Sequence, residues 1–199
     1  YEIGNVIAVV NAGLEETLSD QAEFLLASEV ADAGSIILSR SQEVPVTKQD
    51  ATIEHLNRSL VKLGCRRQIK GDEVLRSPWN EWTEREFEQV LNGGYCTESY
   101  RKPEYREDQG FQSLYYMNLQ IKKEELKEKM KEALKDPACG KLFRIKGFMQ
   151  DENEKWIELN ATQYEIQMNP VGEGQNVLIV IGEGLEEDAL AKYFGTPAR

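Results

Sequence analysis

Four polar residues directly follow a short apolar stretch in the first quarter of the chain. The stretch is "SIIL" at 35–38, and it is followed by Ser39, Arg40, Ser41 and Gln42. In open α/β sheets, ligands bind at the carboxyl ends of the strands, where a polar tip of this kind would lie. The tip therefore holds a ligand, once held one, or only turns the chain.

Two other patterns could bind phosphates, and both are incomplete. "GEGLEE" at 182–187 follows an apolar stretch, as a dinucleotide-binding turn does, but Glu187 replaces the third glycine. The acidic residues at the start of the following helix would repel a pyrophosphate, so we interpret the pattern as a structural turn. "CGKL" at 139–142 lacks the first glycine and the hydroxyl of a phosphate loop. This chain alone is therefore expected not to hydrolyse nucleotide, and no catalytic residue is predicted.

The sequence predicts no metal ligand. His55 is the only histidine, and on a helical wheel it lies away from Ile53, Leu56 and Leu60. We therefore expect the His55 side chain at the surface. Cys96 has no partner cysteine nearby, and a solvated charge run explains its acidic neighbours better than a cation site does. These neighbours are Glu98, Glu104, Glu107 and Asp108.

Composition narrows the class of protein. The 199 residues carry a net charge of −11, which disfavours nucleic-acid binding because phosphates attract clustered Lys and Arg. No apolar run approaches the ~20 residues of a membrane helix, so no membrane partner is expected. The cysteines, Cys65, Cys96 and Cys139, are far apart, which is typical of a protein in the reducing cytoplasm. We therefore expect a cytoplasmic protein.

Residues 1–77 alternate between strand and helix patterns, which predicts an α/β fold with a parallel sheet. "NVIAVV" at 5–10 is continuously apolar, so we expect a strand buried on both faces. The other expected strands are 35–38 and "RRQIK" at 66–70. The helix signals are a cap at Ser19, a capping box of Thr47 with Asp50, and Gly64 as a helix end.

The remaining residues differ in pattern. We interpret 78–110 as a linker with a short helix, in which Trp79, Trp82 and Phe87 anchor the linker against a domain. A partner-binding role for these three residues is the alternative. Residues 111–199 predict a small α+β domain, because closely spaced strands favour an antiparallel sheet and two helix patterns accompany them.

The chain begins with "YEIGNVIAVV", which has no initiator Met and is already inside the first strand pattern. Sheets rarely begin in the middle of a strand at a natural terminus. We therefore expect that an N-terminal portion precedes this sequence in the whole protein. If so, the first strand has an open edge where the strands of that portion would pair.

Three segments resemble the CobW, HypB and UreG type of metallochaperone GTPase, and CobW most closely. "EVADAGSIILSRSQEV" at 29–44 is similar to the CobW segment whose buried strand ends in Asn-Lys-x-Asp, the tip that reads guanine. "RIKGF" at 144–148 and "VLIVIGEGLEEDAL" at 177–190 resemble two blocks of the CobW C-terminal domain. The resemblance implies that 1–77 is the C-terminal half of a P-loop GTPase domain and that 111–199 is a CobW C-terminal domain.

The resemblance also implies GTP as the cofactor, held on its base side by Ser39, Arg40 and Gln42. These residues replace the family's Asn, Lys and Asp. A carboxylate accepts from two guanine donors, whereas Gln42 offers one acceptor oxygen beside a donor amide. Weaker guanine specificity is therefore expected. The phosphate loop, the magnesium ligands and a Cys-x-Cys-Cys site for zinc or another transition metal would lie only in the expected N-terminal portion.

Three functions remain open at this point. The first is a CobW-like nucleotide-dependent metallochaperone or metal-insertion GTPase whose C-terminal domain binds a client metalloprotein or another partner protein. The second is an interaction module without catalysis. The third is a degenerate relative that no longer binds nucleotide. The sequence predicts neither the metal, nor the client, nor the oligomeric state.

Overall fold

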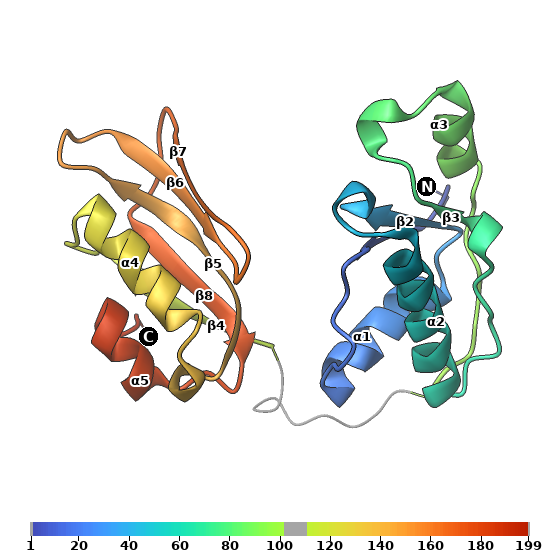
Figure 1. Cartoon of the computed structure of the whole chain (residues 1–199), viewed down its shortest axis with the longest axis horizontal. Coiled ribbons are helices and arrows are strands. Elements are labelled where there is room, and N and C mark those ends of the chain that lie inside the picture. The colour runs from blue at the N-terminus through green and yellow to red at the C-terminus, as the bar shows by residue number, and fades with distance from the viewer. Residues whose placement is uncertain (1, 102–110, 199) are drawn as a thin grey trace. The chain divides into compact units, whose positions relative to one another are not determined.

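The computed structural model describes residues 2–101 and 111–198. The chain divides into two compact units, Tyr1–Glu104 and Tyr105–Arg199, and each is described by itself (Figure 1). The N-terminal unit holds a three-stranded sheet, and the C-terminal unit holds a five-stranded sheet. Within the described residues, no helix combines the length and the apolar character needed to cross a membrane.

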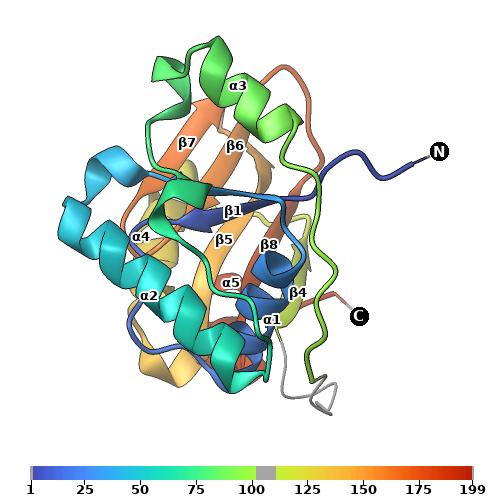
Figure 2. The ribbon, with the colours of Figure 1, turned by 90° about the vertical axis from the view of Figure 1, so that its right-hand side faces the viewer.

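The sheet of the N-terminal unit is parallel, as predicted. Its order is β1-β2-β3, and two helices connect the strands (Figure 2). A third helix follows the sheet in the chain. The elements are β1 (Ile7–Asn11), α1 (Asp20–Ala31), β2 (Ser35–Ser39), α2 (Val46–Lys62), β3 (Val74–Leu75) and α3 (Glu84–Leu91). Short 3-10 turns lie at Ser41–Glu43, Gly71–Glu73 and Trp79–Glu81.

One face of this sheet packs against α1 and α2. Val10 and Leu38 are register partners on that face, and they share a core with Val30 of α1 and Leu56 of α2. The strand β1 was expected to be buried on both faces, and this prediction is wrong. Its burial alternates, and Val9 is 61% exposed. The reason is that successive side chains of a strand point to opposite faces, and α1 and α2 cover only the face that holds Ala8 and Val10.

The strand predicted at 66–70 does not form. Side chains take the place of a neighbouring strand here: Asn57 both donates to and accepts from the backbone of Ile69, at 2.9 and 2.7 Å. Arg67 meanwhile donates to three carbonyl groups at the end of α1, those of Val30, Ala31 and Ala33. The third strand forms later, after a 3-10 turn.

The helix signals were partly correct. Ser19 caps α1 by accepting from the amide of Ala22, and Gly64 follows Leu63, the C-cap of α2, with a φ of +73°. The capping box of Thr47 and Asp50 is wrong, because Pro45 is the N-cap and α2 already begins at Val46. Proline at this position loses nothing, since the amides at a helix start have no partner within the helix.

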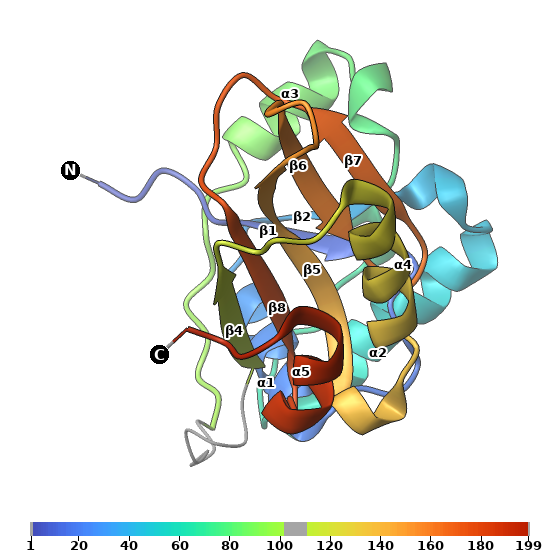
Figure 3. The ribbon, with the colours of Figure 1, turned by 90° about the vertical axis from the view of Figure 1, so that its left-hand side faces the viewer.

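The sheet of the C-terminal unit is antiparallel, as predicted, with the order β4-β8-β5-β6-β7. Both of its helices cover one face (Figure 3), where Leu126, Met130, Leu190 and Phe194 enter the core. The elements are β4 (Phe111–Met117), α4 (Lys123–Ala133), β5 (Lys141–Gln150), β6 (Trp156–Ala161), β7 (Ile166–Pro170), β8 (Val177–Glu183) and α5 (Glu187–Phe194). A 3-10 turn at Pro137–Cys139 precedes β5.

Two close backbone approaches explain glycines in this unit. A Cβ on Gly140 would lie 2.1 Å from the carbonyl oxygen of Gly184, and Gly184 itself has a φ of +56°. The "GEGLEE" pattern is therefore a tight turn between β8 and α5, as the sequence indicated. A Cβ on Gly147, in the middle of β5, would lie 2.0 Å from the carbonyl oxygen of Val177 on β8.

Part of the segment predicted as a linker is hydrogen bonded to the N-terminal unit. Val6 donates to the carbonyl of Gly94, and Cys96 donates to that of Asp32, each at 2.9 Å. The predicted boundaries at 77 and 110 stay predictions. Trp82 packs its ring against Phe87 at 5.3 Å, whereas Trp79 is 77% exposed and anchors nothing.

Candidate functional site

The structure places the predicted binding residues at the carboxyl end of β2, beside the end of β1. Asn11 and Ser39 are register partners there, and the Ser39 hydroxyl donates to the carbonyl of Val10 at 3.3 Å. Arg40 follows in the left-handed region at φ 57°, ψ 27°. This conformation is uncommon for a residue with a Cβ, and it is found at turns and functional sites.

The side chains of this tip divide into buried and exposed groups. Ser39 is half-buried and Ser41 is buried, whereas Arg40 and Gln42 are exposed. Arg40 lies 3.9 Å from the carboxylate of Glu43, and both side chains are about half exposed. Such a surface pair contributes little stability, so it leaves the guanidinium able to exchange partners. Of the three predicted cofactor-binding residues, Arg40 and Gln42 are thus accessible to a ligand, and Ser39 is engaged with the backbone.

The tip of β2, residues 39–42, is held on its buried side by Ser41 and Gln49. The Gln49 amide, which is buried in the first turns of α2, donates to the carbonyl of Ser41 at 2.9 Å. The Ser41 hydroxyl is buried and has no hydrogen-bond partner in the described residues. Thr52, one turn further along α2, donates to the carbonyl of Ala12 at 2.8 Å. The helix therefore holds the ends of both β1 and β2, which makes the tip a rigid platform. Sequence reasoning missed this buried polar row.

His55 continues the same row, so the prediction of a surface histidine is wrong. Its side chain is 7% exposed, and Nε2 lies 2.8 Å from Oε1 of Glu23 on α1. The hydroxyl of Ser59 donates to the other oxygen of Glu23 and also to the carbonyl of His55. The helical wheel failed because the polar row of α2 faces α1 rather than water.

The Glu23 carboxylate is stabilised by this cluster. Burial by itself would raise the pKa of Glu23, but the hydrogen bonds from Ser59 and His55 outweigh it, so the pKa lies below its usual value. Ser59 donates to the Glu23 carboxylate and to the backbone carbonyl of His55, not to the His55 ring, so the three residues do not form a nucleophile with its base. We interpret the cluster as a polar clamp between α1 and α2.

Only some of the residues that were considered for a metal site lie in the described part of the chain. Cys96 is half-buried with a free thiol, and Glu98 lies 4.0 Å from the thiol of Cys65. Across the described residues, no group of three or more His, Cys, Asp or Glu side chains could hold a metal ion. Glu104, Glu107 and Asp108 lie outside the described residues.

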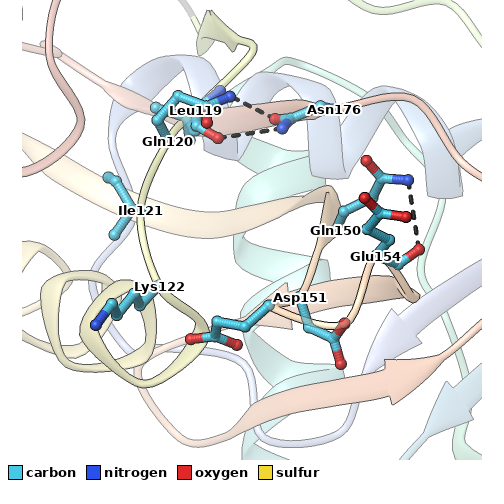
Figure 4. Close-up of a pocket in the computed structure, with 9 residues that line it drawn as sticks. Leu119, Gln120, Ile121, Lys122, Gln150, Asp151, Glu154 and Asn176 are labelled. Carbon is cyan, nitrogen blue, oxygen red and sulfur yellow. Dashed lines mark hydrogen bonds between the residues drawn. The ribbon is translucent and has the colours of Figure 1, made fainter.

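A pocket in the C-terminal unit lies between the segment before α4 and the turn that joins β5 to β6 (Figure 4). Its volume is about 330 Å³. Asn176 holds one wall by donating to and accepting from the backbone of Leu119, and Gln150 donates to the carbonyl of Glu154. The lining includes three acidic side chains and one lysine, and it offers no arrangement that points to a particular ligand. These residues are Asp151, Glu152, Glu154 and Lys122.

The face of the C-terminal sheet opposite its helices is a second candidate site, which we call the outer face. Its exposed apolar side chains lie on β4: Phe111, Tyr115 and Met117 are 43%, 48% and 38% exposed. The register places Tyr115 and Met117 beside the half-buried Ile179 and Val177 of β8, and it places Phe111 opposite Glu183. The further outer-face residues used below, identified by the same register, are Ile181, Arg144, Lys146, Phe148, Glu158 and Asn160.

Comparison with known protein families finds one match, and it lies in the C-terminal unit. Residues 117–196 match the family described as the cobalamin synthesis protein cobW C-terminal domain. The matched residues make up most of the C-terminal unit and less than half of the chain. The resemblance noted for "RIKGF" and for the β8–α5 segment is thereby confirmed. The match runs from the last residue of β4 to just beyond α5, and it does not include the tip of β2.

Two solved structures of the YjiA GTPase are also similar to the chain. One is the Zn(II)-bound protein from E. coli, with 17% identity and a TM-score of 0.36. The other is a Zn(II)-bound triple mutant, with 16% identity and a TM-score of 0.37. Each comparison covers 98% of this chain and 61% of the solved one, so the chain spans about three fifths of their length. No curated protein sequence matches the chain.

Proposed function

We propose that this chain belongs to a CobW-type, nucleotide-dependent metallochaperone. In this proposal the N-terminal unit supplies the loop on the base side of a GTP site, and the CobW C-terminal domain binds a client metalloprotein or another partner protein. The observation that carries the proposal is the CobW match over residues 117–196. Magnesium, and zinc or another transition metal, would bind in segments of the whole protein that this sequence does not include.

The geometry at the tip of β2 supports the nucleotide part. Arg40 and Gln42 are exposed at the carboxyl end of a parallel strand, which is where ligands of such sheets bind. The aliphatic stem of Arg40 is long enough to cover a base, and the Gln42 amide can pair with a polar base edge. The exposed Ile7 and Val9 of β1 support the expected N-terminal portion, because a parallel sheet is ordinarily covered on both faces.

Titration of the whole protein with labelled GTP and ATP tests the nucleotide part. We expect Gln42→Asp to raise the preference for GTP over ATP about tenfold, which corresponds to about 1–2 kcal/mol, because a carboxylate can accept from both guanine donors. Gln68→Asp is the control, because it adds the same charge at an exposed position of another segment. An unchanged ratio in Gln42→Asp would show that the loop does not contact the base.

A non-catalytic interaction module is the second candidate function. The observation that favours it is the set of exposed aromatic and apolar side chains on β4, since large exposed apolar patches mark interaction sites. The two candidates separate in the same titration. If the whole protein binds neither GTP nor ATP at micromolar concentration, the nucleotide part fails, and the interaction module or the degenerate relative remains.

A further inference from the structure

The outer face combines an apolar band with a cationic strand. Tyr115 and Met117 of β4 lie directly opposite Ile179 and Val177 of β8. This pairing makes a continuous apolar band two strands wide at one side of the sheet. An antiparallel sheet is stable with one solvated face, but such a face ordinarily alternates to polar residues. The band is therefore more apolar than solvation of the sheet requires.

Two exposed cations border this band. Arg144 and Lys146 of β5 are the register partners of Ile181 and Ile179. Arg144 donates to the side chain of Asn160 at 2.8 Å, and neither cation forms an ion pair with any described residue. In a chain with a net charge of −11, two unpaired cations side by side on one strand form a local positive area. Glu158 of β6 is on the same face, opposite Phe148.

The charges decide which occupant fits. A second copy bound symmetrically through this face would bring the same patch against itself, and β5 lies in the middle of the sheet. Arg144 and Lys146 would then approach their own counterparts, which is unfavourable. Nucleic acid needs many more cations than two. A protein segment with apolar side chains and nearby carboxylates could pack against the apolar band and form ion pairs with the two cations.

We propose that the outer face of the CobW C-terminal domain binds an acidic, apolar segment of a partner protein. The inference rests on the proposed partner-binding role of this domain, and it adds the surface and the chemistry of the partner. The apolar side chains of the segment pack on Tyr115, Met117 and Ile179. Its carboxylates pair with Arg144 and Lys146, which fixes the orientation of the segment across the sheet and raises its rate of association.

Random 15-residue peptides displayed on phage and selected against the whole chain provide the test. We expect the enriched peptides to combine Asp or Glu with Leu, Ile or aromatic residues. Synthetic peptides from this set should bind the double variant Arg144→Glu/Lys146→Glu at least tenfold more weakly, and Tyr115→Ser at least threefold more weakly. Fluorescence anisotropy at low and at moderate salt measures both affinities, and circular dichroism confirms that each variant is folded.

The control pair is Lys127→Glu/Lys135→Glu, which makes the same change in net charge at exposed positions in and just after α4, on the other face. Equal weakening by both pairs, enriched peptides without acidic residues, or no enrichment at all would overturn the proposal. Peptides that shift the amide resonances around α4 and α5 would also overturn it, while leaving a partner-binding role for the domain.

Two further outcomes separate this inference from the proposed function. A dimer in sedimentation velocity that Tyr115→Ser dissociates would assign the outer face to a second copy and overturn the inference. Failure of the GTP and ATP titration with intact peptide binding would remove the nucleotide part of the proposed function and leave the outer face as assigned.

Discussion

The two sheets of this protein differ in how completely the described chain covers them. The parallel sheet has three strands, and β1 at its edge exposes Ile7 and Val9 at 43% and 61%. The antiparallel sheet has five strands and a core of its own beneath α4 and α5. Parallel sheets ordinarily have both faces covered, whereas antiparallel sheets tolerate one solvated face. The exposed apolar residues are therefore unusual for a parallel sheet in the N-terminal unit and compatible with a solvated antiparallel face in the C-terminal unit.

The units share one device despite this difference. In each unit an asparagine side chain replaces a strand by donating to and accepting from one backbone residue: Asn57 with Ile69, and Asn176 with Leu119. Such pairing satisfies buried backbone groups where no strand can reach. Both units thus use a nearby side chain to complete the hydrogen bonds of these backbone groups. The two units differ instead in their exposed surfaces. The predictions below examine each unit by substitutions that should leave the other unchanged.

The largest expected effect is in the C-terminal unit. Gly147→Val places a Cβ about where the carbonyl oxygen of Val177 lies, at 2.0 Å, and backbone atoms on the neighbouring strand cannot move aside easily. We expect the unit to lose more than about 3 kcal/mol of unfolding free energy. Hydrogen exchange resolved by segment should show loss of protection in β5 and β8 and unchanged protection in α1 and α2.

Gly172→Val is the control for this substitution. A Cβ at Gly172 would meet no heavy atom within 4 Å, and the residue lies in the loop between β7 and β8. We expect its effect to stay within about 0.5 kcal/mol. If both variants destabilise the unit equally, close packing at Gly147 is not the cause.

The next largest effect is in the N-terminal unit. Arg67→Ala removes the donor to three carbonyl groups at the end of α1 and leaves them without that partner. Hydrogen bonds from a charged group contribute about 1.5–3 kcal/mol, so we expect a loss of about that size. Urea unfolding measures it, and Arg66→Ala, at the exposed neighbouring position, should change stability by less than about 0.5 kcal/mol. Equal losses in the two variants would contradict the capping role of Arg67.

These contacts also show what the sequence could predict. The order of strands and helices and the type of each sheet followed from apolar periodicity and from the spacing of the turns. The strand at 66–70 did not, because its partners are the side chains of Asn57 and Arg67 rather than a strand. Periodicity identifies an extended, half-buried segment, and it does not say what receives the backbone hydrogen bonds.

The candidate site was predictable in position and only partly in detail. The polar residues after "SIIL" do lie at a strand end, beside Asn11. The left-handed conformation of Arg40 and the burial of Ser41 could not be predicted from the sequence. For Ser41 the reason is that the sequence does not distinguish a serine that points into the core from one that points to solvent. His55 was misplaced for a related reason: a polar residue off the apolar stripe of a helix is assigned to water unless a partner such as Glu23 is known.

The smallest expected effect concerns that partner and depends on pH. The pKa of Glu23 is below its ordinary value of 4.5 in the folded protein, so the folded state favours the carboxylate. Its contribution to stability is therefore complete above about pH 5 and is lost as the pH falls through the folded-state pKa. Glu23→Gln should cost about 1 kcal/mol at pH 7 and progressively less as the pH falls through the folded-state pKa and the wild-type side chain becomes protonated as well. Thermal unfolding of the N-terminal unit across this pH range measures the difference.

Asp20→Asn provides the contrast. It removes the Lys62–Asp20 ion pair, which is largely exposed, so the substitution should leave the packing of α1 against α2 nearly as stable as before. A difference between wild type and Glu23→Gln that stays constant from pH 7 to pH 3 would show that the clamp between the helices does not depend on the charge of Glu23.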